Sequence, residues 1–137
     1  MIRIEDGLYW VLTNNIAVAA LVGIRMYPIE LPQNPTLPAI TYQVITPSTG
    51  IAHDGLTGVG DSRYQFNGID DNYDVVIDLM NKVRKALGGY KGTAGTAPNT
   101  VVIEAILPVG VGYEAYDPQI KRYSRSLDFY VWHLEET

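Results

Sequence analysis

The sequence contains no cysteine, which excludes disulfide bonds and thiolate chemistry. It has only two histidines, His53 and His133, and neither has a second histidine at the spacing of a helical metal site. The usual ligand sets for zinc and other transition metals are therefore missing. We expect neither a metal nor any other cofactor.

Basic residues are also few. Lys and Arg number 10 against 15 Asp and Glu, which gives a formal net charge of −5. The basic clusters at residues 82–85 and 121–122 are short, whereas nucleic-acid binding depends on many Lys and Arg that neutralise phosphates. We expect no direct, sequence-specific binding to nucleic acid.

Long hydrophobic runs are missing as well. The longest covers residues 16–24, contains Gly23 and falls far below the ~20 apolar residues of a membrane-spanning helix. No association with a membrane is expected. The 137 residues, 47% hydrophobic and 18% charged, are enough for one core, and we predict a single domain over residues 1–137.

The sequence contains parts of catalytic, calcium-binding and phosphate-binding motifs, but each of these motifs lacks a required residue. His53 and Asp54 are adjacent, but no Ser or Cys nucleophile is tied to them by a recognisable motif. Residues 70–74 copy the start of a calcium loop, yet Val75 occupies the position of its obligatory glycine. The glycine pairs of the chain lack the third glycine of a phosphate-binding loop and are interpreted as turns. We predict that the protein is not an enzyme.

Two stretches have the apolar spacing of helices. Residues 5–22 are interrupted at Asn14-Asn15, which predicts either one broken helix or two short ones, ended by Gly23. A further helix is predicted from Asn72 to Leu87, because Asp70, Asp71 and Asn72 favour a helix start. Its expected buried stripe consists of Tyr73, Val76, Ile77, Met80, Val83 and Leu87.

Strands are predicted where β-branched and aromatic residues gather. They cover residues 25–28, 39–46, 61–69, 100–107 and 120–134, and the second and third should pair antiparallel. Residues 88–99 are expected to be a flexible loop, and residues 108–112 and 117–118 are expected to be turns. Within 100–107, alternation places Val101, Ile103, Ala105 and Leu107 on one side. The order of these elements indicates an α+β domain, with an antiparallel sheet of about four to five strands and the helices on one face.

The last predicted strand is apolar on both sides. Leu127, Phe129 and Val131 alternate with Tyr130 and Trp132. If the first three face the core, the other two occupy a face where a monomer would place Lys or Thr. Either a second layer of the chain covers that face, or it is a subunit interface, because Tyr and Trp are favoured in interfaces.

Several segments together resemble the tail completion, or tail terminator, protein family of long-tailed phages with non-contractile tails. The most specific are Arg25-Met-Tyr27-Pro28, Leu37-Pro38-Ala39-Ile40-Thr41-Tyr42-Gln43 and Ser126-Leu127-Asp128-Phe129-Tyr130-Val131-Trp132. Residues 20–23, 63–67, 76–87, 116–118 and 122–125 match in order between and beside them. The resemblance covers nearly the whole chain.

This resemblance implies a structural subunit that forms a ring, usually hexameric, on the last ring of the tail tube. Its implied partners are further copies of itself, the tail-tube protein and the head connector or stopper protein. The implied location is the head-proximal end of the tail in a virion that is assembled in the bacterial cytoplasm. The virion would be encoded by a phage or a prophage. The family supplies no catalytic or cofactor-binding residues.

We expect the subunit interface to include Tyr130 and Trp132, with Arg122 and Arg125 meeting acids such as Glu30 or Glu114 of the next subunit. The long segment 47–60 carries Ile51, His53 and Leu56. We expect it to be mobile in the isolated subunit and to become ordered on contact with a tail partner, because apolar tips on a mobile loop suit insertion into a neighbour.

Two other functions fit the same sequence. A head–tail adaptor or neck stopper would also form a ring, but it would bind the portal side. A small cytosolic ligand-binding domain would need a pocket with converging polar groups, which the sequence does not indicate.

Overall fold

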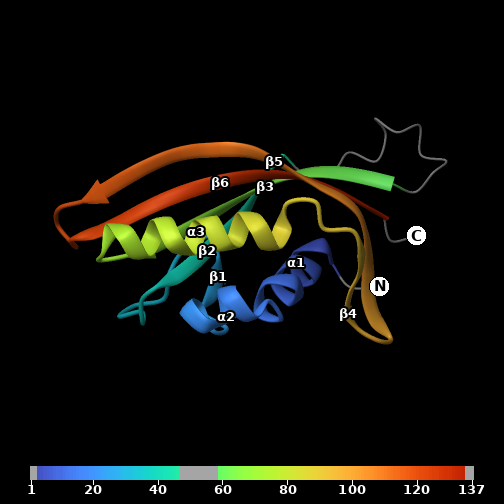
Figure 1. Ribbon diagram of the computed structural model, residues 1–137, viewed down its shortest axis with the longest axis horizontal. Helices are drawn as coiled ribbons and strands as arrows, with labels where there is room; N and C mark the ends of the chain where they lie inside the picture. The colour runs from blue at the N-terminus through green and yellow to red at the C-terminus, as the bar shows by residue number, and fades with distance from the viewer. Residues whose placement is uncertain (1–2, 47–58, 135–137) are drawn as a thin grey trace.

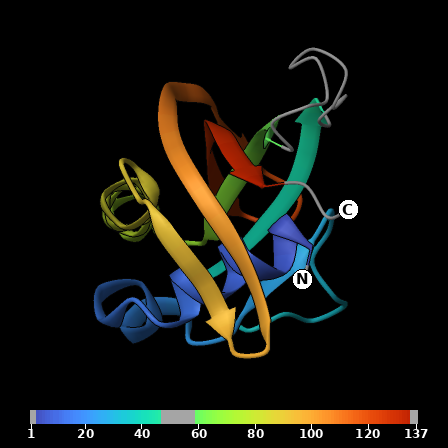
Figure 2. The same ribbon diagram turned by 90° about the vertical axis from the view of Figure 1, so that its right-hand side faces the viewer.

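The computed structural model describes residues 3–46 and 59–134, which form three helices and one six-stranded sheet. The strands lie in the order β1-β2-β3-β6-β5-β4. The helices pack against one face, and the sheet curls so that β4 also contacts α1 (Figures 1 and 2). The helices are α1 (Ile4–Thr13), α2 (Ile16–Val22) and α3 (Tyr73–Leu87). The strands are β1 (Met26–Pro28), β2 (Ala39–Thr46), β3 (Val59–Asp70), β4 (Gly92–Thr96), β5 (Asn99–Asp117) and β6 (Arg122–Leu134).

The predicted α+β class is confirmed, but the sheet is larger than the predicted four to five strands. It is also mixed, because β1 pairs parallel with β2, whereas the other neighbouring strands pair antiparallel. Side-chain alternation shows which residues share a face of the sheet and not whether two strands pair parallel or antiparallel, so the parallel pair was not foreseen.

The N-terminal region forms two helices, the second of the two predicted arrangements. The break lies at Asn14 and Asn15, and the Asn15 side chain accepts a hydrogen bond of 3.1 Å from the Val18 N–H. Gly23, at φ 58°, ends α2, because glycine adopts a positive φ without strain.

Helix α3 begins where the acidic cluster predicted. The Asn72 side chain accepts hydrogen bonds from the Asp74 and Val75 N–H groups, at 2.9 and 3.4 Å. Tyr73 lies outside the buried stripe at 43% exposure, and Ile77 is only half-buried. The buried residues of the helix are Val76, Leu79, Met80, Val83 and Leu87.

The central strands β3 and β6 carry the core, as their alternation predicted. Tyr64 and Phe66 on β3 meet Phe129 on β6, and all three are at most 2% exposed. The rings of Phe66 and Phe129 pack edge to face, with centroids 5.8 Å apart. Leu127 and Val131 complete this row from β6.

Residues 88–99 are not a flexible loop, because they include β4. This strand pairs with β5 from Gly92↔Ile103 to Thr96↔Asn99, and Ala94 is fully buried. Gly7 of α1 allows the helix to approach closely, since a Cβ there would collide with Val101. Hairpin pairing with β5 and packing on the distant helix α1 determine this strand, against the weak strand propensity of glycine.

Strand β5 continues through the predicted turn at residues 108–112. The pairing of β5 with β6 shifts in register at three places, where β5 has extra residues. The shifts lie at 103–105, 108–110 and 111–114. The first shift changes the alternation, so Ile106 is buried while Ala105 and Leu107 face outward. The predicted common side for Val101, Ile103, Ala105 and Leu107 is therefore wrong.

The predicted strand 120–134 corresponds to β6, which spans 13 residues and is shorter than β5 with 19. The turn after Asp117 is confirmed and connects these two strands. The predictions for residues 47–58 fall outside the described part of the chain. Among the residues described, no helix is long and apolar enough to cross a membrane.

Candidate assembly interface

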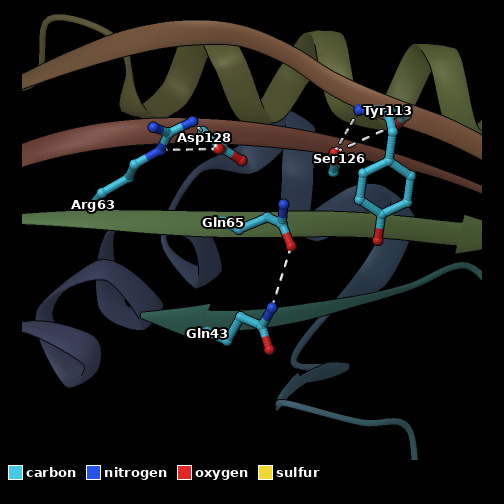
Figure 3. A network of polar contacts seen from close by, with 6 residues as sticks. All are labelled: Gln43, Arg63, Gln65, Tyr113, Ser126 and Asp128. Carbon is cyan, nitrogen blue, oxygen red and sulfur yellow. Dashed lines mark hydrogen bonds and ion pairs between the residues drawn. The ribbon is translucent and has the colours of Figure 1, made fainter. Parts of the chain in front are cut away.

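The sheet face that points away from the helices carries a row of polar and aromatic side chains, here called the outer face. Figure 3 shows six residues of this region: Gln43, Arg63, Gln65, Tyr113, Ser126 and Asp128. They come from β2, β3, β5 and β6, so the row crosses the width of the sheet. Alternation places the β3 and β6 members opposite the core residues of the same strands.

The strongest polar contact of the outer face joins Arg63 and Asp128. The Arg63 Nε and Nη2 atoms lie 3.0 and 2.6 Å from Asp128 Oδ2. These hydrogen bonds to the carboxylate raise the pKa of Arg63. The Asp128 side chain is only 8% exposed, so Arg63 compensates a charge that would otherwise be buried alone.

The cover over Asp128 comes from β5. A Cβ atom on Gly112 would lie 2.5 Å from Ser126 Oγ and 3.5 Å from Asp128 Oδ1, so glycine is needed for this close approach. The Tyr113 N–H donates to Ser126 Oγ at 2.8 Å and fixes the irregular part of β5 against β6.

Tyr130 and Trp132 lie on the outer face, opposite Leu127, Phe129 and Val131, and both are half-buried. Their ring centroids are 6.0 Å apart, and the Arg63 guanidinium carbon lies 5.7 Å from the centroid of Tyr130. The three side chains form a continuous row, Arg63–Tyr130–Trp132, whose exposed parts are available to a partner.

The expected charged contacts divide into two groups. Arg125 and Glu114 are 4.0 Å apart within one chain, and Glu114 also accepts a 2.7 Å hydrogen bond from the Tyr73 hydroxyl. Glu114 and Arg125 therefore stabilise the β5–β6 hairpin itself. Arg122 makes no ion pair with the residues described here, and neither does Glu30, so both are available for an intermolecular contact.

The remaining predicted residues are not placed on the outer face by the described structure. Ile51, His53 and Leu56 fall outside the described residues, so their expected role stays a prediction. His133 is buried, with Nδ1 3.3 Å from the Leu134 carbonyl oxygen. In residues 3–46 and 59–134, no three His, Cys, Asp or Glu side chains are grouped closely enough to hold a metal ion.

Sequence reasoning missed Arg63 and Asp128, which are 65 residues apart. The available signal was their position on the polar side of two alternating strands. The register places Arg63 opposite Tyr130 and Gln65 opposite Asp128. Only this register brings Arg63 into contact with both Asp128 and Tyr130.

The chain shares its fold with a virion component. The solved structure is described as "Virion of native gene transfer agent (GTA) particle". The match has a TM-score of 0.68 at 14% sequence identity, and it covers 96% of this chain and 94% of that one. No known protein family and no curated protein matches the sequence. The likeness establishes the fold over nearly the full length of both chains.

Proposed function

We propose that the protein is a structural subunit of a phage-like virion, and that it serves there as the tail terminator. The observation that carries the proposal is the near full-length match to a component of a gene transfer agent virion. The segments that resemble tail completion proteins lie on the elements that build this fold, namely β1, β2, β3, α3 and β6.

The proposed mechanism is geometric. Copies of the subunit form a closed ring through a heterologous contact that repeats by rotation. One face of the ring fits the last ring of tail-tube protein, and the other fits the head connector but not more tube protein. Tube growth therefore stops, and a joining surface is created at the head-proximal end of the tail.

The outer face suits this role because its polar groups are already held in fixed pairs. Arg63 bonds to Asp128, and the Gln43 amide donates to the Gln65 side-chain oxygen at 3.3 Å. The Arg63–Tyr130–Trp132 row adds half-buried aromatic area, which binds a partner at a small entropic cost. We infer that this row lies in a subunit or partner interface.

Deletion of the gene for this protein from the genome that encodes the particle tests this role. We expect tails that grow well beyond their normal length, together with DNA-filled heads that carry no tail, because nothing halts tube polymerisation. Electron microscopy of lysates would measure both features, with complementation from a plasmid as the control. Tails of normal length that fail to join heads would instead assign the protein to the head–tail adaptors or neck stoppers.

A further inference from the structure

A hollow of about 510 Å³, here called the outer hollow, lies beside the turn that joins β5 to β6. This end of the sheet projects past the N-terminal end of α3 (Figure 1). The lining is mostly apolar, and its polar members are Asp117, Arg122 and Ser124. A mostly apolar hollow of ~300–1,000 Å³ with a few polar groups is typical of a binding site.

Strand register builds the floor of the outer hollow. Ile69 on β3, Ser124 on β6 and Ala115 on β5 are direct cross-strand neighbours. Alternation places Ile69 and Ser124 on the outer face, opposite the core residues of the same strands. The Tyr113 hydroxyl donates to Asn67 Oδ1 at 3.3 Å, which fixes the Tyr113 ring at one side of this floor. Because three paired strands form the floor, a partner can bind here at a small entropic cost.

Two segments outside the paired strands complete the lining with apolar side chains. Leu31 follows β1 in the chain, and Ile120 lies in the turn between β5 and β6. Leu31 is half-buried and Ile120 is 54% exposed. The Gln119 N–H donates to Asp117 Oδ1 at 3.0 Å, which fixes the turn that carries Ile120. The lining therefore suits an apolar side chain supplied from outside.

Arg122 and Ser124 supply hydrogen-bond donors to the outer hollow. They are two residues apart on β6, so their side chains lie on the same face, about 7 Å apart along the strand. Both are half-buried, and Arg122 makes no ion pair with another residue of the described chain. A guanidinium and a hydroxyl in this arrangement can both donate to one carboxylate, and the charged hydrogen bond is the stronger kind.

The acid of the lining, Asp117, leaves this positive charge uncompensated. Asp117 is opposite Arg122 in the β5–β6 ladder, but its carboxylate accepts the Gln119 N–H and the two side chains form no ion pair. Lys121 is exposed next to Arg122 and adds a second cation. In residues 117–122, two cations therefore stand against one acid, in a protein whose formal net charge is −5.

We propose that the outer hollow binds a segment of a partner protein in which an apolar side chain stands next to Asp or Glu. The apolar side chain lies between Leu31 and Ile120, and the carboxylate accepts hydrogen bonds from Arg122 and Ser124. Electrostatic complementarity favours such a segment over one that carries Lys or Arg at the same place. The inference deepens the proposed function and rests on it in one respect, namely that the partner is another protein of the virion.

Peptide binding to the full-length protein tests the site without any other virion component. The probe is the peptide acetyl-Gly-Phe-Glu-Gly-amide, and two control peptides carry Gln or Lys in place of Glu. Two-dimensional NMR spectra of the isotope-labelled protein, recorded at low ionic strength, show which backbone amides each peptide shifts. We expect the largest shifts at Ile69, Ala115 and Ser124. The Lys peptide should bind at least about fivefold more weakly than the Glu peptide, because a charge attraction becomes a repulsion.

Three variants connect this preference to the lining residues. Arg122→Gln should remove most of the difference in affinity between the Glu and Lys peptides. Asp117→Asn should increase that difference, because it removes the competing acid and keeps an acceptor for the Gln119 N–H. Arg84→Gln is the matched control, since it removes a positive charge from an exposed position of α3 and should leave both affinities unchanged.

Equal affinities for the Glu and Lys peptides would overturn the proposal, and so would the absence of saturable shifts in the outer hollow at millimolar peptide concentration. Shifts of the same signals with protein concentration alone would assign the outer hollow to a second copy, which also contradicts it. None of these results bears on tail termination, which the gene deletion tests separately. Binding of the Glu peptide, combined with normal tails after deletion, would keep the site and remove the proposed function.

Discussion

Met80→Asp is expected to unfold the protein or to leave it only marginally folded. Met80 is 1% exposed on α3, and its sulfur lies so close to β3 that a Cβ on Gly68 would come within 2.5 Å of it. A carboxylate there would be buried without a partner, and the thioether contacts would be lost as well. We expect a loss of at least about 4 kcal/mol, a large part of the stability of a typical domain.

Two control variants make this measurement specific. Asn81→Asp adds the same charge to the exposed side of α3 and should change the free energy of unfolding by less than about 0.5 kcal/mol. Met80→Leu keeps the volume and should cost less than about 1.5 kcal/mol. Urea denaturation followed by circular dichroism would give all three values. A folded Met80→Asp variant with the stability of Asn81→Asp would show that the packing of α3 is wrong.

Trp132→Ala is expected to abolish ring formation on tail tubes while the subunit stays folded. Trp132 is half-buried on the outer face and its ring packs at a tilt against Tyr130, so its removal should cost the monomer only about 1–2 kcal/mol. A central aromatic residue contributes about 2 kcal/mol or more to an interface, and in a ring the loss repeats at every contact.

A tail-assembly reaction would compare wild type, Trp132→Ala and the exposed control Ile16→Ala. Rings should be counted by negative-stain microscopy, and the fold of each variant checked by thermal unfolding. Rings from Trp132→Ala at the wild-type frequency would remove the outer face from the interface. An unfolded Trp132→Ala monomer would instead assign Trp132 to the core.

Elements with a strong local pattern were predictable from the sequence. Helix α3 combines an Asn72 cap with an apolar stripe, and β6 alternates cleanly from Leu127 to Val131. Both signals come from neighbouring residues on one element. The α+β class followed from the order of such elements.

Elements that depend on contacts outside their own residues could not be predicted. The glycine-rich β4 becomes a strand only because β5 and α1 are beside it. Pro108 fits inside β5 because no described strand pairs with that side of β5 at this position, so the missing N–H costs no ladder hydrogen bond. The Arg63–Asp128 pair likewise depends on strand register, which is a property of the whole sheet.

We propose that this subunit ends a growing tail tube. The most direct measurement adds the purified protein to polymerising tail-tube protein of the same particle and records tube length and end structure by electron microscopy. We expect the tubes to stop growing and each to carry one ring of this protein at one end. Tubes that lengthen as they do without the protein, with no ring at either end, would contradict it.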